Sequence, residues 1–143
     1  IAVHWYDWGS NPVANPNHTA EQIFARFQNY LTTVHNLHGL PIWITEFNAN
    51  PARSNATNAA FMALALPYLE TLDYVERYAW FPYETGTNYY ELTPDPENPG
   101  EFIDTTTLTA VGTAYKNQVS TPAIPETTLD ENNNLNLVNC NCE

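Results

Sequence analysis

Apolar residues recur at three- and four-residue intervals between Thr19 and His38, a spacing that predicts one face of a helix. Thr19 and Gln22 have the spacing of a capping box at its start, and Gly39 provides a stop signal at its end. The apolar positions of this face are Ile23, Phe24, Phe27, Tyr30, Leu31, Val34 and Leu37. The sequence therefore predicts an amphipathic helix over residues 19–38.

A short hydrophobic run follows this helix directly. Residues 41–47 are mostly β-branched and aromatic, hydrophobic on both faces and too few for another helix, which is typical of a buried parallel strand. Residues 1–6 and 74–83 have the same strand-like character. Three strands are therefore predicted.

Two further helices are predicted between and after these strands. The first is capped by Ser54 or Asn55, continues to Leu72 and is kinked by Pro67. The second is short and spans residues 109–119, after a loop rich in Pro, Asp and Asn. A regular alternation of strand and helix predicts βαβ units with right-handed crossovers. The expected fold class is therefore α/β with a parallel sheet.

The composition changes near residue 120 to Thr, Pro, Asn, Asp and Glu, so residues 120–143 are expected to form an acidic, disordered tail. Three apolar residues near the end offer one short extra strand with no evident partner: Leu135, Leu137 and Val138. The folded part is expected to span residues 1–119. Because Ile1 already lies inside a predicted strand, we expect the chain to be part of a longer protein.

The composition is that of an acidic protein with enough apolar residues to form a core. Hydrophobic residues make up 43% of the 143 residues and aromatic residues 13%. Sixteen acidic residues against four basic ones give a formal net charge of −12, which opposes binding to nucleic acid and to anionic membranes. No stretch approaches the roughly 18–20 apolar residues that a membrane span needs. We expect neither nucleic acid nor a membrane as a partner, and the oligomeric state stays open.

Neither the cysteines nor the histidines form a recognisable metal site. Cys140 and Cys142 lie one residue apart at the C-terminus, and a C-x-C pair lacks the four ligands of a structural zinc site. No metal and no cofactor are predicted. Acceptor sequons at Asn17 and Asn55 are compatible with a secreted or cell-wall protein, although such triplets also arise by chance.

Polar or aromatic side chains stand near the end of each predicted strand. In parallel β/α folds, ligands bind at the carboxyl ends of the strands. Alternation along a strand places His4 with Tyr6 on one face, and Glu46 with Asn48 on one face. The candidate site residues are therefore His4, Tyr6, Trp8, Glu46, Asn48 and Trp80.

Glu46 carries the strongest chemical signal. It lies in a hydrophobic run that offers no charge partner, and holding a carboxylate there costs free energy. The cost is offset if the carboxylate acts on an oxocarbenium-like centre, as the nucleophile of a retaining glycosidase does. The alternative is a strand-end glutamate that caps the following loop.

The other site candidates have expected roles and equally simple structural alternatives. Tyr6 is expected to donate its hydroxyl to Glu46, and His4 to bind a sugar hydroxyl or orient a carboxylate, although both also fit the pattern of satisfied core groups. Trp80 is a candidate floor for a sugar ring, but a buried tryptophan in a strand is commonly part of the core. The candidates for a second catalytic carboxylate are Asp7, Glu84 and Glu91.

Four sequence blocks together resemble glycoside hydrolase family 128, the alkali-sensitive-linkage type of glycosyl hydrolase catalytic core. The resemblance spans residues 1–116. The blocks are Val3-His4-Trp5-Tyr6, Leu40 to Phe47, Val75 to Phe81 and Leu108 to Tyr115.

The resemblance implies a β/α barrel that cleaves β-1,3-glucan with retention. It assigns the nucleophile to Glu46, the glutamate of the W-x-T-E-F block, and the donor-sugar site to His4, Tyr6 and Trp80. Residues 1–119 would then be strands six to eight of a TIM-type barrel with their helices. The family's acid/base glutamate follows an asparagine on the fourth strand, and no such pair precedes Glu46 here. The resemblance therefore implies that this chain alone lacks the proton donor.

Two other classes of function remain open from the sequence. A non-catalytic carbohydrate-binding or cell-wall module would use the aromatic residues to bind glucan, with Glu46 only as a hydrogen-bond acceptor. An esterase is disfavoured because the chain has no Gly-x-Ser-x-Gly elbow.

Overall fold

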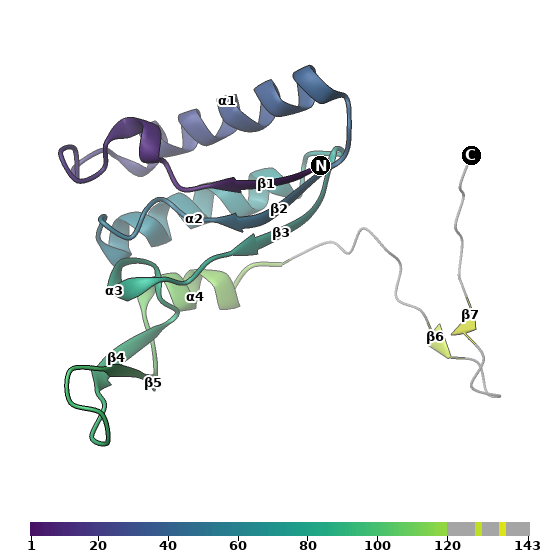
Figure 1. The fold of residues 1–143 in the computed structure, drawn as a ribbon. Helices are drawn as coiled ribbons and strands as arrows, with labels where there is room; N and C mark the ends of the chain where they lie inside the picture. Colours follow the sequence, from purple (N-terminus) through teal and green to yellow (C-terminus); the bar gives the residue numbers. More distant parts are fainter. Residues whose placement is uncertain (120–127, 130–134, 137–143) are drawn as a thin grey trace.

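The computed structural model describes residues 1–119, 128–129 and 135–136. Its centre is a parallel sheet of three strands in the order β1 (Ala2–Trp5), β2 (Ile42–Phe47) and β3 (Val75–Trp80) (Figure 1). The helices α1 (Ala20–His38) and α2 (Asn55–Leu69) connect these strands. The predicted α/β class and parallel sheet are therefore confirmed.

The start of each long helix follows the predicted capping chemistry. Thr19 accepts a hydrogen bond from the Gln22 backbone, and the Gln22 side chain accepts one from the Thr19 backbone, so the capping box is present. Ser54, not Asn55, caps α2 by accepting from the Thr57 backbone. Helix α2 ends at Leu69 rather than Leu72, two residues beyond Pro67.

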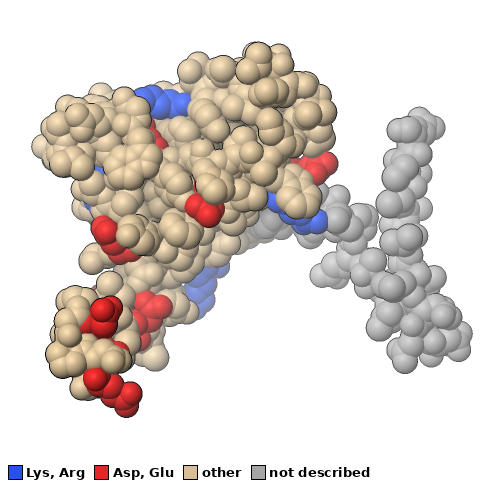
Figure 2. Space-filling view, viewed as in Figure 1, with Lys and Arg blue, Asp and Glu red and all other residues tan. Residues whose placement is uncertain are grey.

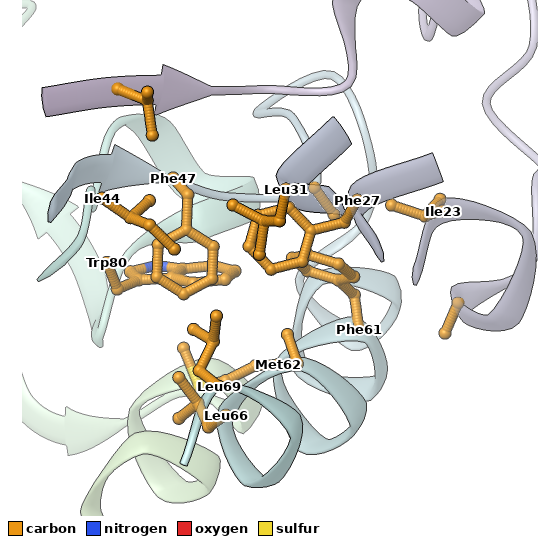
Figure 3. Packing of buried hydrophobic residues seen from close by; sticks show 14 of the residues in the cluster. Ile23, Phe27, Leu31, Ile44, Phe47, Phe61, Met62, Leu66, Leu69 and Trp80 are labelled. Atoms are coloured by element: carbon orange, nitrogen blue, oxygen red, sulfur yellow. The ribbon is translucent and has the colours of Figure 1, made fainter. Parts of the chain in front are cut away.

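The core lies on the face of the sheet that the helices cover. Phe47 packs between Phe27 of α1 and Phe61 of α2, with ring centroids 5.4 and 6.3 Å away (Figure 3). Ile44, three residues earlier on β2, is fully buried in the same cluster because an irregularity in the β2–β3 register lies between it and Phe47. Burial of these large apolar groups is the main source of stability in this part of the chain.

The opposite face of the sheet is exposed among the described residues, which differs from the prediction of a strand buried on both faces. Trp43 of β2 is 48% exposed, and its indole nitrogen donates to Glu76 of β3 at 2.5 Å. Thr45 is exposed on the same face. Neither helix reaches this side, so the sheet is layered with helices on one side only.

A β-hairpin takes the place of the predicted loop after β3. A short helix α3 (Glu84–Thr87) leads into the antiparallel strands β4 (Tyr90–Pro94) and β5 (Phe102–Leu108), before the last helix α4 (Ala110–Lys116). The hairpin projects from the body of the molecule and carries a concentration of acidic side chains (Figures 1 and 2). The turn at residues 95–100 contains Asp, Pro, Asn and Gly, which are typical of loops. For this reason the sequence pattern predicted a loop here rather than two strands.

Within the predicted tail, β6 (Thr128–Leu129) and β7 (Leu135–Asn136) pair in antiparallel fashion. Leu135 therefore has the strand partner that the sequence did not reveal. The rest of the predicted tail, including Leu137, Val138 and both cysteines, lies outside the described residues. Among the helices that the structure describes, none has the length and apolar character needed to cross a membrane.

Candidate active site

The three parallel strands end at one edge of the sheet, and this edge carries the candidate site. Strands β1 and β2 pair directly, with His4 opposite Glu46 in the register. The loops that follow each strand, the 3-10 turn Trp8–Ser10 and helix α3 lie at the same edge (Figure 1). Residues from three distant stretches of sequence are thereby brought together.

Glu46 is held at this edge by two neighbours, His4 of β1 and Tyr6 directly after β1. The Tyr6 hydroxyl donates a hydrogen bond to Oε2 of Glu46, and Nδ1 of His4 lies 3.5 Å from the same oxygen. Within the described part of the chain, both contacts go to Oε2 and none to Oε1. The Glu46 side chain keeps 34% exposure, so Oε1 is left for another molecule. The predicted contact between Tyr6 and Glu46 is confirmed.

The Tyr6 hydroxyl is protonated and can donate a hydrogen bond, because its pKa is raised. Burial raises the pKa of Tyr6 above its ordinary value, and the hydrogen bond to Glu46 and the negative charge of that carboxylate raise it further. The Tyr6 hydroxyl therefore stays protonated and donates to Oε2, which fixes the orientation of the Glu46 carboxylate.

An aromatic hollow of about 390 Å³ lies beside Tyr6. Trp8, Phe81 and Tyr83 line it, with exposures of 61%, 36% and 55%. The Phe81 and Tyr83 rings are stacked at 14° with centroids 6.0 Å apart. Trp8 was predicted as a binding residue, whereas Phe81 and Tyr83 were missed.

Trp80 does not line this hollow, which corrects the prediction of a sugar-stacking role. It is 4% exposed and packs edge-on against Phe47 in the core, with centroids 5.4 Å apart (Figure 3). Its indole nitrogen donates to the Thr87 carbonyl at 2.9 Å. Trp80 pairs with Phe47 in the register, so it belongs to the helix-facing side, and the next residue, Phe81, takes the exposed position.

Asn48 lines the hollow, and its side-chain amide already forms hydrogen bonds with backbone groups. Its nitrogen donates to the Phe81 carbonyl at 2.9 Å, and its oxygen accepts from the Asn50 backbone at 2.8 Å. Asn50, at φ 96°, donates from its side chain to the Tyr6 carbonyl at 2.8 Å. These buried amides tie together the chain segments that follow all three strands, which is a positioning role. The sugar contact of Asn48 stays a prediction, since Asn48 also lines the hollow.

Asp7 is a buried structural carboxylate, which corrects its candidacy as a second catalytic group. Its side chain is 2% exposed and accepts two hydrogen bonds from Arg26 at 2.7 Å, one from Arg53 at 2.9 Å and one from Ser10 at 2.8 Å. Burial alone would raise the pKa of Asp7, but the hydrogen bonds from Arg26, Ser10 and Arg53 and the charge of Arg26 lower it. An acid with a lowered pKa and no free oxygen cannot serve as a proton donor near neutral pH.

Arg53 completes this buried cluster and fixes the loops around the site. Its side chain has no exposed surface, and it donates to the carbonyls of Ala49 at 3.0 Å and Asn15 at 2.8 Å as well as to Asp7. One guanidinium thereby joins the loop after β1 to the loop after β2. Sequence reasoning missed Arg26 and Arg53, because both lie far from Asp7 along the chain.

A family model described as the glycosyl hydrolase catalytic core matches residues 1–115. The chain belongs to the glycosyl hydrolase catalytic core family. This confirms the family resemblance seen in the sequence. No curated protein sequence matches the chain.

Solved structures that resemble this member of the family include endo-β-1,3-glucanases of family 128, subgroup I, from Amycolatopsis mediterranei. A variant of that enzyme with one glutamate replaced by alanine, in complex with laminaritriose and laminaribiose, is 29% identical with a TM-score of 0.57, and the match covers 82% of this chain and 44% of that one. The enzyme in complex with laminaritriose is 30% identical with a TM-score of 0.56, covering 81% and 43%. The chain therefore spans less than half the length of these neighbours.

The described residues of this family member offer no cluster of three or more His, Cys, Asp or Glu side chains that would hold a metal ion. His4, Tyr6 and Trp8 also line a second hollow of about 680 Å³, which extends to Arg26 of α1. The candidate site therefore consists of the Glu46 carboxylate, its partner Tyr6 and the two hollows that Tyr6 lines.

Proposed function

We propose that the protein hydrolyses β-1,3-glucan with retention of configuration and that Glu46 is the nucleophile. The observation that carries this proposal is the Glu46 carboxylate, with Oε2 bound by Tyr6 and Oε1 left open, at the carboxyl end of a parallel strand. Membership of the glycosyl hydrolase catalytic core family and the glucanases among the structural neighbours support it.

The first step of the proposed mechanism is attack by Glu46 on the anomeric carbon. A bond forms between a Glu46 oxygen and that carbon while the glycosidic C–O bond breaks, and a second carboxylic acid gives its proton to the departing oxygen. Water, deprotonated by the same second group, then displaces Glu46 and yields a product of the original configuration. Tyr6 fixes the orientation of Glu46 through its hydrogen bond to Oε2.

We propose that the proton donor lies outside these 143 residues. A retaining mechanism needs two carboxyl groups about 5–5.5 Å apart. Asp7, the acidic residue next to Tyr6, cannot be the second one, because its carboxylate is already bound by Arg26 and Arg53. The three βα units would then be the last part of a TIM-type barrel, whose remaining strands cover the exposed face of the sheet. The length of the neighbours, of which less than half is matched, supports this reading.

Laminarin hydrolysis by the full-length protein and by the 143-residue chain tests the proposal. We expect reducing-sugar release by the full-length protein and the β anomer as the first product in proton NMR. The 143-residue chain alone is expected to be inactive. Release of the α anomer first, or robust hydrolysis by the 143-residue chain, would contradict the mechanism.

A non-catalytic glucan-binding module is the second candidate. The exposed Trp8 and Tyr83 side chains favour it, because such rings bind sugars without any chemistry. Laminarin binding by the full-length protein without any hydrolysis would support this candidate over the first.

Replacing Tyr6 by phenylalanine tests how far Glu46 depends on its partner. A hydrogen bond to a charged group contributes about 1.5–3 kcal/mol, so we expect kcat to fall roughly 10- to 100-fold. Steady-state kinetics on laminarin, with Tyr115→Phe on α4 as a tyrosine control outside the site, measures the effect. A kcat equal to that of the wild type would show that the contact plays no part in catalysis.

A further inference from the structure

Glu84 adopts a backbone conformation that is costly for its residue type. It lies at φ 60°, in the left-handed region, where a side chain with a Cβ is strained. The Glu84 side chain is exposed and lines the aromatic hollow together with Phe81 and Tyr83. Strained residues persist only where the surrounding structure fixes them, and they concentrate at ligand sites.

The turn around Glu84 is fixed by contacts that do not involve its side chain. The Tyr83 backbone donates to the Thr87 hydroxyl at 2.7 Å, and that hydroxyl donates back to the Tyr83 carbonyl. Trp80 binds the Thr87 carbonyl from the core. At Gly86 the backbone approaches the carbonyls of Pro51 and Arg53 so closely that a Cβ would overlap them.

This turn holds Glu84 at the start of the four-residue helix α3 and beside the hollow. Among the described residues, no Lys, Arg or His forms an ion pair with Glu84, in contrast to Asp7 with its two arginines. Glycine at this position would relieve the strain, so the glutamate side chain is retained at a cost to stability. A binding role explains that cost.

We propose that Glu84 is a substrate-binding residue that accepts hydrogen bonds from the hydroxyl groups of a sugar seated in the aromatic hollow. This inference rests on the proposed glucan-hydrolase function. The C–H face of a sugar ring packs on exposed rings such as Trp8 and Tyr83, while its hydroxyls remain at the rim. A carboxylate there binds neighbouring hydroxyls through charge-assisted hydrogen bonds.

The charge of Glu84 also sets the class of sugar that the hollow accepts. A carboxylate with no cationic partner attracts hydroxyl donors and repels sulfate or carboxylate groups on a substituted polysaccharide. The hollow therefore selects a neutral, unsubstituted glucan. Carboxymethylated glucan is expected to be a poorer substrate than laminarin for the wild-type protein.

Substitution of Glu84 in the full-length protein tests the proposal. We expect Glu84→Gln to raise KM for laminarihexaose and its Kd by calorimetry about tenfold, which corresponds to ~1.4 kcal/mol, with kcat changed less than about twofold. The preference of this variant for laminarin over carboxymethylated glucan, measured as the ratio of kcat/KM values, should be smaller than that of the wild type. Glu97→Gln in the turn between β4 and β5 removes the same charge outside the hollow and is expected to leave all these values unchanged.

Glu84→Gly separates binding from folding. We expect it to weaken laminarihexaose binding as much as Glu84→Gln while its Tm stays at or above that of the wild type, because the strain is relieved. A clearly lowered Tm would show that Glu84 has a structural role and would overturn the proposal, as would a Glu84→Gln variant with unchanged Kd and KM. A kcat lowered by orders of magnitude at constant KM would make Glu84 the proton donor instead.

A failure of the proposed hydrolase function is distinguishable from a failure of the Glu84 proposal. A wild-type protein that binds laminarihexaose without cleaving it would contradict hydrolysis, while the Kd values of the two Glu84 variants would still decide the binding role. A wild-type protein that neither binds nor cleaves laminarihexaose overturns both proposals.

Discussion

Replacing Glu46 by glutamine is expected to lower kcat for laminarin at least about 10³-fold, because the amide keeps the size of the side chain and removes its nucleophilic charge. The effect is expected in kcat rather than in KM, since the amide still fits among Tyr6 and His4. Glu97→Gln in the exposed turn between β4 and β5 provides the matched control with full activity. Steady-state kinetics of the full-length protein measures both.

The fold of the Glu46→Gln variant is expected to remain intact, which separates loss of chemistry from loss of structure. The Glu46 side chain is 34% exposed and contacts Tyr6 and His4 without entering the hydrophobic core. Its Tm and its Kd for laminarihexaose should therefore stay close to the wild-type values. Activity within a few-fold of wild type would remove Glu46 from the mechanism and favour the binding-module alternative.

Replacing Asp7 by asparagine is expected to destabilise the protein by about 3–5 kcal/mol, because it leaves the fully buried Arg53 guanidinium without a counter-charge. Such a loss is a large share of the roughly 5–15 kcal/mol that stabilises a typical domain. Urea unfolding measures it through the transition midpoint. Asp73→Asn, an exposed residue before β3, makes the same chemical change and is expected to shift stability by less than about 0.5 kcal/mol.

The contribution of Asp7 also has a defined pH dependence. Its pKa is lowered in the folded state, so the unfolded chain binds a proton more readily and protonation favours unfolding. The stabilisation is fully present above the unfolded pKa, near 3.8, and is lost as the pH falls through the lower folded value. The stability difference between the wild type and Asp7→Asn should therefore narrow below this pH, and a constant difference would contradict the assignment.

The sequence predicted the elements that depend on local pattern. The helix over residues 19–38 and the capping pair of Thr19 and Gln22 depend on neighbours along the chain, and both were confirmed. The predicted apolar face is buried or half-buried only as far as Val34, since Leu37 is 74% exposed. The meeting of Tyr6 and Glu46 also followed from simple rules, because strand alternation and parallel pairing bring two strand ends to one edge.

The features that the sequence did not predict depend on contacts across long stretches of chain. Asp7 resembled a free strand-end carboxylate because its partners, Arg26 and Arg53, lie 19 and 46 residues away. Trp80 and Phe81 are adjacent aromatic residues, and the pattern of residues 74–83 does not fix which of them faces the core. The register of Trp80 with Phe47 decides it. The φ value of Glu84 leaves no signal in the sequence at all.

Covalent trapping of the nucleophile tests the central claim most directly. A fluorinated laminaribiosyl fluoride, whose fluorine slows release of the glycosyl-enzyme, is incubated with the full-length protein, and the labelled peptide is identified by mass spectrometry. The account predicts one disaccharide per protein molecule, attached to Glu46, and no label in Glu46→Gln. A label on any other carboxylate of a hydrolytically active protein would contradict it.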